Sequence, residues 1–185
     1  FYKIGIRTYI MKKKSYLIIF ILIFVSIIFL NKKSYRYIGV NYIVEKTEIS
    51  NFRKLSDFYE RHINYKKLVK EITQDSKDKK EEIINLSTWV YKNIRKISEG
   101  DTVIDNHPWT IVERKLGASD QFSDILSVLL VHNDIDSFFT TKLIKTIHPI
   151  TFFKYDSEWC IIDPYYGVYF INNENSFSTI KENRN

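Results

Sequence analysis

The clearest pattern of apolar positions in the chain is an uncharged run from Ser15 to Leu30, which contains almost no polar side chain. Lysines lie close to both ends of this run. A membrane-spanning helix needs about 20 apolar residues, with a lower limit near 17, and flanking lysines can extend their charged ends into water. The pattern therefore predicts a single transmembrane helix over residues 15–31, preceded by a basic N-terminal flank over residues 1–14.

A cleavable signal peptide has a similar pattern, because it also places a charged stretch before an apolar core. Asn31, Lys32 and Lys33 follow the apolar run, and no small-x-small cleavage pattern is present there, so a retained anchor is favoured. Five basic residues precede the run and three follow it closely. This imbalance weakly favours a single-pass membrane protein whose domain lies outside the cytoplasm, with the membrane as a partner through Ser15–Leu30.

Helical spacing of apolar residues begins near Ile49, after a mixed stretch over residues 32–48 that we interpret as a juxtamembrane linker. Residues 49–81 are expected to form a helical lead-in, which ends in a polar run. A second helix follows, and its apolar stripe is predicted to face the core. That stripe consists of Ile83, Ile84, Leu86, Trp89, Val90 and Ile94.

Residues 98–117 are predicted to form a loop, because Gly, Asp, Asn and Pro residues interrupt the helical spacing there. A third helix is expected over about residues 119–132, because apolar residues recur there at helical spacing. Helices followed by an antiparallel meander define an α+β fold, which we place at residues 82–175 with a tail over 176–185. After about residue 134, apolar and polar residues alternate with a period of two, which predicts the four strands of this meander. They lie near residues 137–144, 147–155, 158–163 and 168–171.

Charge and composition exclude several classes of function. The net charge is +6, but residues 1–40 contain eight basic residues and no acidic one. The other 20 basic and 22 acidic residues leave residues 41–185 with a net charge of −2, which gives no electrostatic reason to expect a nucleic acid partner. The four histidines are scattered and no Cys/His spacing indicates zinc, so neither a metal nor a cofactor is predicted.

Candidate chemistry gathers at the start of the third helix and on the strands that follow. The turn into that helix, Gly117–Gln121, contains Ser119, while His148 lies at the head of a strand and Asp163 near the end of the next. A polar residue at a helix N-terminus that faces a histidine and an aspartate from neighbouring strands has the geometry of a nucleophile, a base and an orienting residue. Ser119, His148 and Asp163 are therefore the candidate catalytic residues.

With this order of motifs, the chain resembles the transglutaminase-like superfamily, whose fold is related to that of the papain-like cysteine proteases. Gly117–Gln121 is similar to the G-x-C-D-Q helix start of bacterial members, except that Ser119 replaces the cysteine. The resemblance covers about residues 82–172 and implies a papain/transglutaminase-like fold with a Cys-His-Asp triad for acyl transfer or amide hydrolysis. A second block with the pattern H…W…DP…G…F is matched by His148, Trp159, Asp163, Pro164, Gly167 and Phe170.

The serine changes the chemistry that this resemblance implies. A cysteine at a helix N-terminus beside a histidine can be a thiolate near neutral pH, because the helix dipole and the imidazolium lower its pKa. Those influences cannot ionise a serine hydroxyl, so Ser119 could react only if His148 removed its proton and an oxyanion hole were in place. We therefore interpret Ser119 as a helix N-cap or the remnant of a nucleophile, ahead of an active serine.

Further residues are candidates for the lining of the same cleft. Cys160 is the single cysteine of the chain, and strand alternation places it on the face opposite Trp159 and Asp163. It is therefore expected to be a small core residue and not a substitute nucleophile. The candidate cleft residues are His107, Trp109, Asp120, Gln121 and Trp159.

These observations support three hypotheses about function. The leading one is a membrane-anchored, catalytically degenerate transglutaminase-like module that binds a peptide, a protein or a cell-surface glycan component in the former active-site cleft. The alternative is an amidase, protease or acyltransferase with Ser119 as nucleophile, His148 as base and Asp163 as orienting residue. The third, weaker hypothesis is a structural partner of a membrane assembly, held there by the apolar helix.

Overall fold

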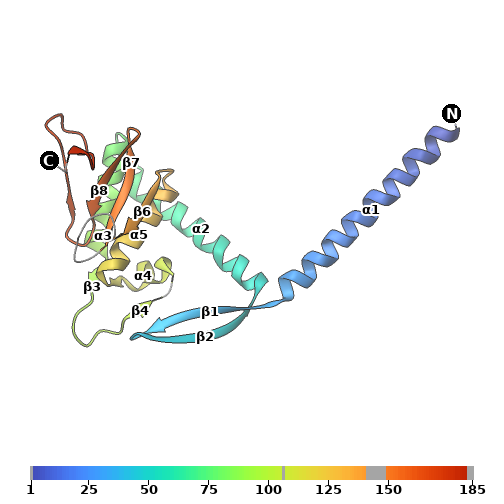
Figure 1. The fold of residues 1–185 in the computed structure, drawn as a ribbon, viewed down its shortest axis with the longest axis horizontal. Helices are drawn as coiled ribbons and strands as arrows, with labels where there is room; N and C mark the ends of the chain where they lie inside the picture. The colour runs from blue at the N-terminus through green and yellow to red at the C-terminus, as the bar shows by residue number, and fades with distance from the viewer. Residues whose placement is uncertain (1, 106, 141–148, 183–185) are drawn as a thin grey trace. The chain divides into compact units, whose positions relative to one another are not determined.

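The computed structural model describes residues 2–105, 107–140 and 149–182 (Figure 1). The chain divides into two compact units, and the candidate catalytic positions all belong to the second. The first unit consists of residues up to 36 and 46–58, and the second of residues 37–45 and 59–185.

The first unit contains a long helix, the base of a β-hairpin and the beginning of a second helix. The hairpin occupies the stretch that we interpreted as a linker over residues 32–48. Most of its second strand is exposed, so the strand lacks the alternation of apolar and polar positions that would predict it. The elements are α1 (Tyr2–Asn31), β1 (Lys33–Val40), β2 (Ile43–Ser50) and α2 (Asn51–Thr73).

Ion pairs join the hairpin base to α2 within this unit. Asp57 of α2 is only 8% exposed, and its carboxylate pairs with Arg36 of β1. Arg53, one turn before Asp57, places its Nε 2.8 Å from the same carboxylate. Two guanidinium groups therefore neutralise the carboxylate of Asp57. Burial of this charge without a partner would lower the stability of the fold.

Within the described residues, no helix has both the length and the apolar character that a membrane span requires. The transmembrane helix predicted over residues 15–31 is therefore not confirmed.

In the second unit, α5 is the central element, since it contacts two other helices and the largest sheet. Five apolar residues of α5 are fully buried, as the sequence pattern predicted, and the observed helix covers the predicted range. The helices are α3 (Lys79–Asn93), α4 (Pro108–Arg114) and α5 (Ser119–His132). The sheet is antiparallel and contains, in spatial order, β6 (Ser137–Thr140), β7 (Ile150–Tyr155), β8 (Glu158–Asp163) and β9 (Val168–Tyr169).

The two faces of this sheet have separate apolar clusters. Phe153, Cys160 and Ile162 lie in the main core together with residues of α3 and α5. Phe152 and Ile161 belong to a smaller cluster on the alternate positions of the same strands. This arrangement confirms the α+β class and the prediction that Cys160 is a core residue. The predicted strand positions 141–148 lie outside the described residues.

Short elements fill the region that we predicted to be loop, residues 98–117. Pro108 is the first residue of α4, where its missing N–H and fixed φ are favourable, and seven residues are too few to display a helical period. Two short strand pairs complete this region. They are β3 (Arg95–Lys96) parallel to β5 (Leu116–Gly117), and β4 (Ile104–Asp105) antiparallel to β1 at Gly39 and Val40.

The segment assigned to a tail, residues 176–185, contributes to the core over its described part. Phe177 is 2% exposed and packs edge-on against Phe153, with ring centroids 4.9 Å apart. The backbone N–H of Ile180 donates to the carbonyl of Trp159 at 2.9 Å. The domain therefore continues beyond residue 175.

Candidate functional site at the start of α5

The residues before Ser119 fix the point at which α5 begins. Gly117 is buried, and a Cβ atom there would lie 3.1 Å from Ile111 and 3.2 Å from Ile94, so a larger residue would be crowded. Ala118 is the N-cap, with φ −79° and ψ 169°, and Ser119 is the first helical residue. The interpretation of Ser119 as the N-cap is therefore wrong by one position. Its side chain is partly exposed, and it makes no hydrogen bond within the described part of the chain.

Gln121 supplies a side-chain acceptor and donor at the start of α5. Its Oε1 accepts from the backbone N–H of Ala118 at 2.9 Å, which is the reciprocal half of a capping box. Its Nε2 donates to the carbonyl of Ile104 at 2.9 Å, so the same side chain also holds β4. Gln121 is 6% exposed, and both of its polar atoms are engaged with backbone. It therefore stabilises the helix start and the wall of the cleft.

Asp163 ends β8 and organises the turn that follows. Its Oδ1 accepts from the backbone N–H groups of Tyr165 at 3.0 Å and Tyr166 at 3.1 Å, which is an Asx turn. Gly167 closes the turn with φ +69°, and a Cβ at this position would lie 3.0 Å from the ring of Tyr91. The carboxyl group is thus held in one orientation by its own turn.

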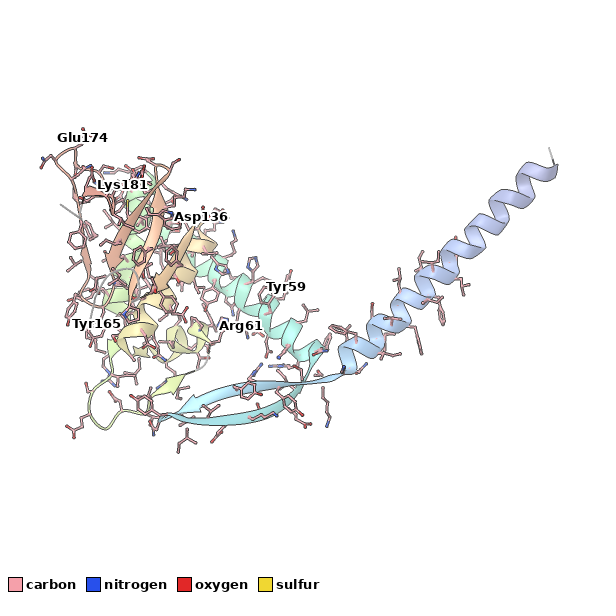
Figure 2. All side chains as sticks on the ribbon, in the orientation of Figure 1. Tyr59, Arg61, Asp136, Tyr165, Glu174 and Lys181 are labelled. Carbon is pink, nitrogen blue, oxygen red and sulfur yellow. The ribbon has the colours of Figure 1, made fainter. Side chains whose placement is uncertain are left out.

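Aromatic contacts bring this turn to the first turn of α5. The ring of Tyr165, labelled in Figure 2, packs edge-on against Phe122 with centroids 5.2 Å apart. The Nζ of Lys96 lies 4.2 Å from the centre of the Tyr165 ring and 5.1 Å from that of Tyr166. Since Lys96 is paired with Gly117, the Asp163 turn and the approach to Ser119 form one packed region.

His148, the candidate base, lies outside the described residues. The next residue, Pro149, accepts a hydrogen bond through its carbonyl from Ser123 Oγ at 2.7 Å. Ser123 follows Ser119 by one helical turn, and Thr151 Oγ1 donates to the Ser123 carbonyl at 3.2 Å. The beginning of β7 is therefore attached to the first two turns of α5, and the role of His148 stays a prediction.

A cavity of about 310 Å³ lies beside the start of α5. Ala118, Asp120 and Gln121 form one part of its wall, and Asp120 is exposed. The rest is formed by distant residues, which no sequence pattern connected with the site. They are Gly39, Tyr42 and Val44 at the hairpin tip and Val103 before β4.

Asp163 lines a second cavity of about 290 Å³, whose other residues are almost all apolar. Tyr166 forms part of this wall, so the Asx turn supplies both the carboxyl group and an aromatic side chain. The start of α5 and the end of β8 thus each border a hollow of a size that accepts a side chain or a small ligand. The remaining lining residues are Ile150, Ile161, Ile162, Val168 and Phe170.

His107 and Trp109 belong to a different cluster. His107 Nδ1 accepts from the backbone N–H of Trp109 at 3.2 Å and caps α4, while Tyr65 of α2 places its hydroxyl 3.4 Å away. Trp109 packs edge-on against Tyr65 and donates through Nε1 to Glu113 at 2.8 Å. Neither residue is among those that line the two cavities. Both therefore join α4 to α2.

Trp159 and Cys160 lie near the far end of β8 from the Asp163 turn. Trp159 is four residues from Asp163, roughly 13 Å along a strand, and packs edge-on against Phe138. Cys160 is 1% exposed, and burial raises the pKa of its thiol to about 11. This thiol is therefore protonated at neutral pH and is inaccessible to substrate.

The lowered pKa of His107 predicts a loss of stability in mildly acidic solution. Burial, with the nearby charge of Arg61, lowers the pKa of His107 from 6.5 to about 4. The unfolded chain takes up a proton at higher pH than the folded one, so the free energy of unfolding falls as the pH drops from about 6.5 towards 4. We expect the Tm of His107→Asn, which keeps an N-cap acceptor, to fall less than that of the wild type between pH 7.5 and 4.5. Equal declines would contradict this assignment.

Comparisons with known proteins leave the family unassigned. No family model matches the chain, and no curated protein matches it. A solved structure of a candidate cysteine protease from Cytophaga hutchinsonii aligns with 64% of this chain at 16% sequence identity and a TM-score of 0.47. The aligned region covers 41% of that protein, so this chain corresponds to less than half of its length.

Proposed function

We propose that this chain is a catalytically degenerate papain/transglutaminase-like module that binds a peptide, a protein or a cell-surface glycan component at the start of α5. The observation that carries the proposal is the placement of its one thiol. Cys160 is buried in the core with a pKa of about 11, whereas the first residue of α5 is Ser119. Cysteine-type acyl transfer therefore has no nucleophile in this chain.

The field at the start of α5 favours a remnant site over a working serine site. A serine nucleophile needs a base that is hydrogen-bonded to its hydroxyl, and the predicted base, His148, lies outside the described residues. The helix terminus adds a favourable field for an anion, but this field cannot ionise a hydroxyl at neutral pH. A serine in place of the cysteine thus removes the nucleophile, while the cavity beside the helix start remains available for binding.

The two cavities support binding as the retained function. They have volumes of about 310 and 290 Å³ and combine apolar walls with the polar side chains of Asp120 and Asp163. Pockets with mostly apolar walls and a few placed polar groups are the usual form of ligand sites. Each cavity is large enough for one side chain of a ligand. A peptide or a similar extended ligand could therefore bind by inserting one or two of its side chains.

One observation favours the alternative, a hydrolase or acyltransferase with a Ser119-His148-Asp163 triad. The carboxyl group of Asp163 is oriented by two backbone N–H groups, in a turn that packs against the first turns of α5. An orienting carboxylate is the third member of such a triad. In this reaction Ser119 Oγ would attack a carbonyl carbon while His148 accepted the hydroxyl proton and then donated it to the leaving group.

Labelling with a fluorophosphonate probe distinguishes the two functions. We expect no covalent label at Ser119 in the full chain, and the same result for Ser119→Ala. Stoichiometric labelling that disappears in Ser119→Ala and in His148→Ala would overturn the degenerate assignment and establish the serine triad. Intact-protein mass spectrometry gives the stoichiometry directly.

Binding is tested separately with a tryptic peptide mixture and with soluble cell-wall fragments, measured as ligand retained after gel filtration. Ala118→Phe fills the cavity beside α5, and we expect it to remove retention. Val131→Phe, on an exposed part of the same helix, is the matched control and should leave retention unchanged. Retention that is equal in both variants would place the ligand elsewhere.

A further inference from the structure

Two histidines from different helices meet at the contact between α2 and α5. His62 Nδ1 and His132 Nε2 are 3.2 Å apart, and the ring centroids are separated by 5.1 Å at an interplanar angle of 46°. Both residues belong to the second unit. The two imidazoles are 70 positions apart in the chain, so no local motif signals the pair.

The tautomer of His132 is fixed by its backbone partner. His132 Nδ1 lies 2.8 Å from the carbonyl oxygen of Val128, and a carbonyl only accepts hydrogen bonds. The proton is therefore on Nδ1, and the lone pair of Nε2 is directed to His62. A histidine whose second nitrogen donates to a backbone carbonyl is the usual arrangement around protein-bound metals, because this bond fixes the ring and raises its basicity.

The spacing of the two nitrogens fits a shared metal ion. Zinc binds imidazole nitrogen at 2.0–2.1 Å, and tetrahedral geometry then separates two nitrogen ligands by about 3.3 Å. The observed separation of 3.2 Å is close to this value, so a bound metal requires the two rings to turn until both lone pairs converge on it, with little change in the distance between the nitrogens. We propose that His62 and His132 form a two-histidine site for a transition-metal ion of the Zn²⁺, Ni²⁺ or Cu²⁺ class. On binding, Nδ1 of His62 releases its proton to solvent and Nε2 carries the ring proton, so that both lone pairs can face the metal.

The surroundings of the pair allow a metal with water as its remaining ligands. No group of three or more His, Cys, Asp or Glu side chains suited to a metal occurs in the part of the chain that the structure describes. His62 is exposed, and His132 borders a surface hollow of about 350 Å³. Of the charges near His132, Lys66 and Asp134 pair with each other at 3.6 Å and largely cancel. Tyr65 of α2 packs against the ring of His132, with centroids 4.8 Å apart.

A metal at this place would join α2 to α5. Figure 2 labels Arg61, the neighbour of His62 on α2, and the same stretch of helix contributes Tyr65 to the core. A ligand that binds only the docked helix stabilises the folded chain by mass action. The site therefore couples metal concentration to the attachment of α2, and it is independent of the function proposed for the start of α5.

The test is calorimetric titration of the full chain with Zn²⁺ at pH 7.5, without a histidine-containing tag. We expect one Zn²⁺ per chain, at least tenfold weaker binding in His62→Ala and in His132→Gln, and unchanged binding in the control His107→Asn. Because His62 is exposed, His62→Ala tests the site even if His132→Gln fails to fold. Zn²⁺ should also raise the Tm of the wild type and of the control only.

A spectroscopic arm identifies the ligands. Cu²⁺ bound to the wild type should show two nitrogen ligands by electron paramagnetic resonance, and one nitrogen in His62→Ala. No Zn²⁺ binding by the wild type, or equal affinity in His62→Ala, would overturn the proposal and leave the pair as a hydrogen bond between helices.

Discussion

Replacing Ser119 by cysteine is expected to create a thiol that reacts with iodoacetamide at neutral pH, with a pKa well below the free-cysteine value of about 8.5. Residue 119 is the first of 14 residues in α5, and its partly exposed side chain lies in the positive field at the helix N-terminus. The wild type is the control, since burial raises the pKa of Cys160 to about 11 and its background reaction should be negligible. The measurement is the rate of alkylation at Ser119→Cys between pH 5 and 10.

A second substitution separates the helix field from the predicted histidine. If His148 faces residue 119, adding His148→Ala to Ser119→Cys should raise the thiol pKa towards the free value, because the imidazolium no longer stabilises the thiolate. A thiol in Ser119→Cys that titrates like free cysteine would mean that no triad geometry is retained. The resemblance to cysteine-type enzymes would then not extend to this site.

The sequence predicts the second unit well where burial imposes a period. The five apolar residues of α5 and the alternation around Cys160 follow from helix and strand geometry alone, and both are observed. The hairpin over 33–50 and the short helix α4 were missed because one is largely exposed and the other has only seven residues. Membrane attachment and a position outside the cytoplasm stay predictions of the sequence.

The sequence predicted which residues form the candidate site when they follow one another in a spaced motif. It did not predict the residues from distant segments that line the cavity. Ser119 and Asp163 were named from a spaced motif, and the structure attaches the Asp163 turn to α5 through Tyr165. His107 and Trp109 precede Ser119 in the chain but face Tyr65, because the cap of α4 directs them to α2. Tyr42 lines the cavity from a hairpin that is distant in sequence, and such contacts leave no periodic signal.

Gln121→Ala is expected to destabilise the chain by about 1–3 kcal/mol, since it removes two hydrogen bonds to partly buried backbone groups. The N–H of Ala118 loses its acceptor and the carbonyl of Ile104 loses its donor. Asp120→Ala, at the exposed neighbouring position, is the matched control and should cost no more than about 1 kcal/mol. Urea denaturation of both variants gives the comparison, and equal stabilities would show that Gln121 does not hold the helix start.

Gln121→Glu tests the two bonds one at a time. The carboxylate can still accept from Ala118, but it cannot donate to the carbonyl of Ile104, and a buried charge then faces a carbonyl oxygen. We expect the loss of stability to shrink as the pH falls and Glu becomes protonated, because the acid regains a donor. A pH-independent loss would contradict the bond to β4. The Gln121 side chain holds both Ala118 and β4, and Gln121 and Ala118 line the cavity at the start of α5. A substitution that breaks either bond should therefore weaken ligand retention as well as lower the free energy of unfolding.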